Sequence, residues 1–168
     1  MKKLLFIAIA AAAAWWYFIA GKTLTEEQAT DFYRAVEKAT LDRKPEDLCN
    51  LLAEDFSGTG NVALGGTSKT ESQTKEQTCE GYRDLYAAWE KLGEKMGGTL
   101  QLDSNYEIHS ITLSADKKTA KVDISSSLDV AGTLTNIKAR STDTLVKRNG
   151  KVLLLRSEGS AQVGAGGV

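Results

Sequence analysis

The sequence predicts an α+β domain in which helices come first along the chain and an antiparallel sheet follows them. Residues 103–160 read as three or four long strands joined by short turns. Two upstream segments repeat apolar residues at spacings of three and four, which is typical of amphipathic helices. The length of 168 residues suits one domain. We therefore expect helices packed on one face of a sheet.

The clearest predicted strand covers residues 119–130, in which apolar and polar residues alternate. A period of two buries one face of a strand and leaves the other in water. Its inward row reads Ala120, Val122, Ile124, Ser126, Leu128 and Val130, with Ser126 as the one polar member. Residues 106–113 form its expected partner, across a polar turn at residues 115–118.

The next strand is expected over residues 133–147, but its alternation is imperfect. A bulge near Asn136 would restore the register. Until that register is known, Asp143 has no assigned face. The dipeptide Asn149-Gly150 then predicts a tight hairpin, because a type I′ turn needs positive φ at both central residues. Residues 151–158 are the last predicted strand, and residues 161–168 are expected to form a flexible tail.

Two helices carry the same start signal. A Thr followed three residues later by Gln predicts a capping box at Thr25–Gln28 and again at Thr74–Gln77. The helices are expected over residues 25–41 and 74–96, and Pro45 opens a short helix between them. Residues 62–67 are read as a short strand or hairpin, and residues 68–72 as a loop.

The first 21 residues are interpreted as a targeting segment. Lys2 and Lys3 precede an apolar run over residues 4–20, which is at the short end of what spans a bilayer. Aromatic residues at positions 15–17 favour an uncleaved anchor, while a cleaved signal peptide remains the alternative. Either way the domain is exported. It then faces the periplasm from the inner membrane, or is periplasmic or secreted.

This order of elements resembles the nuclear transport factor 2-like superfamily, over residues 24–160. The segment 51–56, Leu-Leu-Ala-Glu-Asp-Phe, which leads into the first strand, is part of the resemblance. The resemblance implies three helices on a bent antiparallel sheet of about four to six strands, enclosing a cone-shaped cavity. The domain itself is expected over residues 22–160.

The only two cysteines, Cys49 and Cys79, are expected to form a disulfide. An exported chain meets an oxidising compartment, and an even cysteine count suits pairing. The bridge would join the short helix to the long one. Two buried free thiols are the alternative.

Seven residues are candidates for lining the cavity that the resemblance implies: Tyr33, Tyr82, Tyr86, Trp89, Asp31, His109 and Asp123. Such pockets combine apolar walls with a few polar groups, and a buried carboxylate can act as a general base. Each candidate also has a simpler interpretation. Aromatic residues on helix faces usually belong to the core, and carboxylates on polar rows are usually solvated. His109 would be a partly exposed strand residue without ligands beside it.

Composition and motifs narrow the function. A net charge of −1 gives no electrostatic basis for binding nucleic acid. We find no phosphate-binding glycine loop and no hydrolase motif, and we expect no cofactor and no metal site. The sequence favours an exported, membrane-anchored accessory domain, without catalysis, that binds a protein partner or a small apolar ligand in the cavity. A homodimer or an envelope protein would use the open sheet face, and a purely structural oligomerisation role is also compatible.

The alternative is a small cavity enzyme. The resemblance includes ketosteroid isomerase and polyketide cyclases, in which a cavity carboxylate moves a proton. Tyr33 or Tyr86 with Asp123 or Asp31 is the assembly that the residues suggest.

Overall fold

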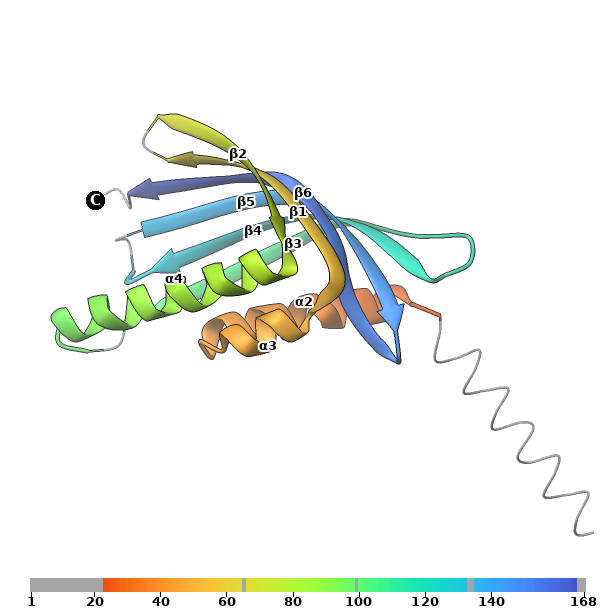
Figure 1. Cartoon of the computed structure of the whole chain (residues 1–168), viewed down its shortest axis with the longest axis horizontal. Coiled ribbons are helices and arrows are strands. Elements are labelled where there is room, and N and C mark those ends of the chain that lie inside the picture. Colours follow the sequence, from red (N-terminus) through yellow and green to blue (C-terminus); the bar gives the residue numbers. More distant parts are fainter. Residues whose placement is uncertain (1–22, 65, 99, 133–134, 166–168) are drawn as a thin grey trace, which may run out of the picture.

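The computed structural model describes residues 23–64, 66–98, 100–132 and 135–165. The elements are α2 (Glu26–Leu41), α3 (Pro45–Asn50), β1 (Leu52–Leu64), β2 (Thr67–Thr74), α4 (Lys75–Lys95), β3 (Leu102–Leu113), β4 (Thr119–Val130), β5 (Thr135–Arg148) and β6 (Lys151–Ala165). Figure 1 shows the helices gathered on one side of a strongly curved sheet. The predicted α+β class, with three helices on a sheet, is confirmed.

The six strands form one sheet in the order β2-β1-β6-β5-β4-β3. Every neighbouring pair is antiparallel except β1 and β6, which run parallel. The expectation of a wholly antiparallel sheet is wrong at this pair. The chain crosses through α4 to the far edge, and the meander from β3 then brings β6 back beside β1 in the same direction.

The hairpin turn predicted at Asn149-Gly150 is confirmed, but the irregularity in β5 lies at another position than the predicted bulge. Asn149 and Gly150 have φ values of 51° and 77°, and Arg148 pairs with Lys151 across a two-residue hairpin. A bulge near Asn136 is wrong, because β4 and β5 pair without a break. The register shift lies where Thr144 and Leu145 of β5 meet β6. In the unbroken pairing of β4 with β5, Asp143 lies opposite Val122 and shares its inward face.

Two polar stretches belong to the sheet. Residues 68–72, expected as a loop, lie in β2, which pairs antiparallel with β1. Ser and Thr suit an edge strand whose faces are mostly open to water, so the apolar alternation that marks a strand is missing. Likewise β6 continues past the expected end at Glu158 to Ala165, paired with both β1 and β5.

The helices begin where the sequence predicted. Both capping boxes are present, at Thr25–Gln28 and Thr74–Gln77. The first helix, α2, buries Phe32 and Tyr33 against the inward face of the sheet. The long helix α4 is different, because Leu85, Leu92 and Met96 stay partly exposed. Only its first turns therefore take part in a continuous core.

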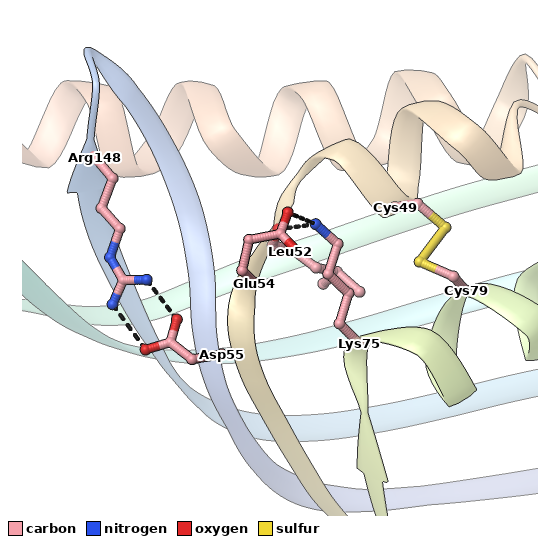
Figure 2. A network of polar contacts seen from close by, with 7 residues as sticks. All are labelled: Cys49, Leu52, Glu54, Asp55, Lys75, Cys79 and Arg148. Carbon is pink, nitrogen blue, oxygen red and sulfur yellow. Dashed lines mark hydrogen bonds and ion pairs between the residues drawn. A yellow bond between two sulfur atoms is a disulfide. The ribbon is translucent and has the colours of Figure 1, made fainter.

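The start of α4 is tied to α3 and β1 (Figure 2). Cys49 and Cys79 form the predicted disulfide, with a Cα–Cα distance of 5.4 Å. Lys75 Nζ donates to the carbonyl of Leu52 at 3.0 Å and pairs with Glu54 at 2.7 Å. These contacts fix one end of α4, while Figure 1 shows the rest of it running out along the inward side of the sheet.

An ion pair holds the β5–β6 hairpin against β1. Arg148 and Asp55 make a two-pronged contact, in which Arg148 Nη2 donates to Asp55 Oδ2 at 3.0 Å. Asp55 lies in the part of β1 where pairing with β6 is interrupted, between Leu52 and Ser57. The contact therefore links the strands at a place where the ladder does not.

Within the described residues, no helix combines the length and the hydropathy that a membrane span requires. The apolar run over residues 4–20 and the boundary at residue 21 lie outside the described residues, so the targeting segment stays a prediction.

Candidate functional site

A cavity of about 350 Å³ lies between α2, α4 and the inward face of β3, β4 and β5. Its apolar wall consists of Val36, Leu85, Ile124, Leu128 and Ile137. The helix period of α2 and the strand period of β4 and β5 both direct these side chains inward. The cavity is thus formed where α4 stands away from the sheet.

The polar end of the cavity is built around Asp143. This carboxylate is 5% exposed, and it is the one charged residue among the buried residues of the described chain. Tyr33 Oη of α2 donates to Asp143 Oδ2 at 2.9 Å, and Ser157 Oγ of β6 donates to Asp143 Oδ1 at 2.7 Å. Three separate elements therefore fix the position of this carboxyl group.

The environment changes the acidity of both groups. Burial raises the pKa of the Asp143 carboxyl above its ordinary value, and hydrogen bonds from Ser157, Tyr33 and Ser141 offset part of that rise. Burial also raises the pKa of Tyr33, and the negative charge of Asp143 raises it further. Tyr33 consequently remains a protonated donor, and Asp143 holds a proton more readily than a solvated carboxyl does.

A second hollow of about 280 Å³ adjoins this site on the side of β1, β2 and β6. It is lined by Gly159, Ser157 and Tyr82, and it shares Ser141 with the first cavity. A Cβ at Gly159 would lie 2.3 Å from the carbonyl oxygen of Arg140, so glycine is required for the close strand contact. Burial, with the charges of Tyr86 and Asp143, raises the pKa of Tyr82 to about 12.

The aromatic candidates are divided among three places. Tyr33 lines the Asp143 cavity, and Tyr82 lines the adjoining hollow. Tyr86 and Trp89 line a different pocket, beside Arg43. The two rings meet edge to face with centroids 5.2 Å apart, and Tyr86 Oη donates to the Thr40 carbonyl at 3.2 Å. Burial raises the pKa of Tyr86.

The carboxylate and histidine candidates lie outside the cavity lining. Asp31 is exposed on α2 and pairs with Arg34 at 2.6 Å. His109 stands at the register shift of β3, with Nε2 2.7 Å from Ser125 Oγ on the outward face. Asp123 also faces outward.

Asp123 and Asp143 show how the two faces differ. Asp123 accepts hydrogen bonds from Thr142 Oγ1 at 2.7 Å and Ser110 Oγ at 3.0 Å, and these bonds lower its pKa. Asp143 accepts similar bonds, but burial outweighs them and raises its pKa. The two carboxylates stand on neighbouring strands and face opposite sides of one sheet, and only Asp143 reaches the cavity.

Asp143 and Glu37 are acidic cavity residues outside the seven candidates: the sequence left the face of Asp143 open and did not single out Glu37. The face of Asp143 follows from the pairing with β4, in which it lies opposite Val122, and from the buried Leu145 two residues further along β5. Glu37 follows Val36 on α2 and resembles any exposed helix carboxylate in sequence. In the part of the chain that the structure describes, no three His, Cys, Asp or Glu side chains converge as metal ligands would.

Comparison with known proteins identifies the architecture. No protein-family model matches the chain, and no curated protein matches it in sequence. An NTF-2 like protein of unknown function from Silicibacter pomeroyi superposes with a TM-score of 0.53 at 10% identity, covering 82% of this chain and 94% of that one. A conserved protein from Planctomyces limnophilus gives 0.54 at 12% identity, covering 81% of this chain and 94% of that one.

A third similar structure is a ketosteroid isomerase-like protein from Erwinia carotovora atroseptica. Its TM-score is 0.52 at 17% identity, and the match covers 82% of this chain and 98% of that one. At such identities the likeness concerns the path of the backbone and says nothing of the side chains in the cavity. Its element order, its sheet topology and its likeness to these structures show that this chain has the nuclear transport factor 2-like fold.

Proposed function

We propose that this domain binds a small, largely apolar ligand in the cavity, with a polar group of the ligand placed at Asp143. The observation that carries the proposal is a buried carboxylate at one end of an apolar-walled cavity of about 350 Å³. Small-molecule sites typically combine such walls with a few fixed polar groups, in volumes of about 300–1,000 Å³.

Separate groups of residues would bind the apolar part and the polar group of the ligand. Ile124, Leu128 and Ile137 would cover the apolar part of a ligand, which is favourable because that surface leaves water. Tyr33 and Ser157 hold Asp143 in one orientation, so the polar contact needs little rearrangement on binding. This arrangement supports selection of a ligand by shape and by one polar group, without a chemical step.

A second candidate function is proton transfer by Asp143. Burial raises the pKa of this carboxyl, which is the property that a general base needs near neutral pH. Tyr33 would then support the carboxylate as a positioning residue. The discriminating experiment is to identify the bound compound and incubate it with the protein. Unchanged compound after prolonged incubation would contradict the catalytic alternative.

The location of the domain is also a proposal. Residues 1–21 support export and a membrane anchor, so the cavity would open to the periplasm. The polar outward face of the sheet remains available to an envelope protein or a second copy. Intact mass of the chain isolated from its host tests the anchor, and a missing N-terminus would contradict it. Solution mass at several concentrations tests self-association.

Native mass spectrometry of the chain isolated from its host tests ligand binding. Ser126 points into the cavity from the inward row of β4 and is exposed there, so Ser126→Phe should fill the space without displacing a packed side chain. Thr112→Phe is the matched control, because Thr112 is an exposed residue of β3 outside the cavity lining. We expect a small-molecule adduct on wild type and Thr112→Phe, and a bare mass for Ser126→Phe.

An adduct that persists on Ser126→Phe would contradict the proposal, and so would its absence from all three proteins. In either case a protein-binding role for the domain would become the better account.

A further inference from the structure

The charged lining of the Asp143 cavity is entirely acidic. Glu37 of α2 and Asp143 of β5 both line it, whereas no Lys, Arg or His of the described residues does. The other polar lining groups are neutral hydroxyls, including those of Tyr33 and Tyr106. An anionic ligand would therefore meet repulsion and no compensating cation.

Asp143 also lacks a counter-ion of its own. Its hydrogen-bond donors are the hydroxyls of Tyr33, Ser157 and Ser141, and no cationic group of the described chain forms an ion pair with it. Burying a carboxylate with neutral partners alone is costly, because the charge loses its hydration. A carboxylate can accept about four hydrogen bonds and three are in use here, so the site has acceptor capacity left for a ligand.

Lys38 of α2 and Lys147 of β5 are engaged elsewhere. Lys38 pairs with Asp42 at 2.6 Å on the solvent side of α2. Lys147 Nζ donates to the Thr23 carbonyl at 2.9 Å and to Gln28 Oε1 at 3.2 Å, at the start of α2. Glu37, in turn, makes no ion pair or side-chain hydrogen bond with a described residue. The fold thus supplies two carboxylates at the cavity and directs these cations away.

The walls of the cavity suit an organic cation. The rings of Tyr33 and Tyr106 lie 6.0 Å apart at an interplanar angle of 36°, beside the carboxylate. Aromatic faces attract an ammonium group through their quadrupole. Ile124 and Leu128 then offer an apolar surface to whatever carries that group.

We propose that this cavity selects a compact organic amine, whose ammonium group pairs with Asp143 while its apolar body packs between α2, α4 and the sheet. This inference rests on the proposed ligand-binding function and names the chemical class of the ligand. The amine supplies the positive charge that the buried carboxylate lacks, and Glu37 adds to the attraction at the cavity wall.

A matched series of three probes tests the inference. The full-length chain in a neutral detergent is titrated calorimetrically, at neutral pH, with 2-phenylethylamine, 2-phenylethanol and phenylacetate. These probes share one aromatic body and differ in a cationic, neutral or anionic end. We expect the amine to bind at least about tenfold more tightly than the alcohol, and phenylacetate to bind most weakly.

Three variants test which carboxylate produces the preference for the amine over the alcohol. Asp143→Asn keeps the shape of the side chain and should remove the advantage of the amine over the alcohol. Glu37→Gln, at a half-buried helix position where folding is not at risk, should reduce that advantage in part. Asp123→Asn, on the outward face, should leave it unchanged.

An amine that binds no more tightly than the alcohol overturns the inference, whether both bind or neither does. So does an amine preference that survives in both Asp143→Asn and Glu37→Gln. The ligand-binding function is judged separately by the adduct on wild type and its loss in Ser126→Phe. If the cavity holds an adduct but shows no preference for the amine, the ligand-binding function stands and the proposed class of ligand is wrong.

Discussion

Tyr33 and Asp143 lie 110 positions apart in the sequence and meet through a 2.9 Å hydrogen bond from the Tyr33 hydroxyl to Asp143 Oδ2. The contact joins α2 to β5 across the core. Both residues also line the cavity, so the bond that helps to hold the helix on the sheet also orients the polar end of the site. Stability and ligand binding should therefore respond together when this pair is changed.

Tyr33→Phe removes the donor and leaves a buried carboxylate with one partner fewer. We expect the free energy of unfolding to fall by about 1–3 kcal/mol, because the desolvated group is no longer satisfied. Urea denaturation followed by circular dichroism measures the loss. Tyr86→Phe is the matched control, since Tyr86 donates to a neutral backbone carbonyl and should cost less, about 0.5–1.5 kcal/mol. Equal losses in both variants would contradict the special role of the Tyr33–Asp143 pair.

The dependence of stability on pH should have opposite signs for the two carboxylates of the sheet. The folded state raises the pKa of Asp143 above the ordinary 3.8, so it binds more protons than the unfolded state once the pH exceeds that value. Its contribution is present below pH 3.8 and is lost as the pH rises through the raised pKa. Wild type should therefore lose stability relative to Asp143→Asn as the pH rises above the ordinary value of 3.8 and through the raised pKa.

Asp123 supplies the comparison. Hydrogen bonds from Thr142 and Ser110 lower its pKa, so its contribution is present above the ordinary value of 3.8 and is lost as the pH falls through the lowered pKa. Wild type should lose stability relative to Asp123→Asn on acidification. The denaturant midpoints of wild type, Asp143→Asn and Asp123→Asn, measured across pH, test both predicted directions. If the midpoints of wild type and Asp143→Asn changed in parallel with pH, Asp143 would not be a buried titrating group.

The disulfide should stabilise the domain through the unfolded chain. Cys49 and Cys79 close a loop of 30 residues, for which chain-entropy arguments give about 3–4 kcal/mol. The double variant Cys49→Ser, Cys79→Ser should therefore unfold at a clearly lower Tm. Dithiothreitol should lower the Tm of wild type and leave the double variant unchanged. If dithiothreitol lowered the Tm of both proteins equally, the loss of stability would have a cause other than reduction of the disulfide.

Replacing each of two glycines by alanine should change the stability of the domain in opposite directions. At Gly159 of β6 a Cβ would meet backbone atoms of β5 at 2.3 Å and 2.8 Å, so Gly159→Ala must separate two paired strands. We expect a loss of more than about 2 kcal/mol, or failure to fold. At Gly81 of α4 nothing lies within 4 Å, and Gly81→Ala should stabilise the helix by about 0.5–1 kcal/mol. Thermal unfolding of both variants checks the contrast.

Local signals predicted the parts of the fold that local physics decides. The capping boxes at Thr25 and Thr74, the Asn149-Gly150 turn and the strand at Thr119–Val130 each depend on neighbouring residues, and each is present. The strand β2 was not predicted, because its Ser- and Thr-rich sequence becomes a strand only through pairing with β1.

The site depends on contacts that no local pattern encodes. Asp143 faces the cavity because β5 pairs with β4 in a register that sets Asp143 opposite the buried Val122, a property of two strands together. Asp31 was a candidate cavity carboxylate in the sequence, yet its position on α2 faces solvent, where it pairs with Arg34. The cavity lies beside α4, whose first half is held by the disulfide, by Lys75 and by the Tyr86–Thr40 hydrogen bond, and that arrangement is set by packing across the whole domain.

The most direct test of the cavity is to locate a bound probe by NMR. Ile124 and Ile137 line the cavity, whereas Ile111 of β3 packs in the core outside it. With isoleucine methyl groups labelled, we expect 2-phenylethanol or 2-phenylethylamine to shift the signals of Ile124 and Ile137 and to leave Ile111 little changed. Shifts at Ile111 alone, or no shift with either probe, would contradict a ligand site at Asp143.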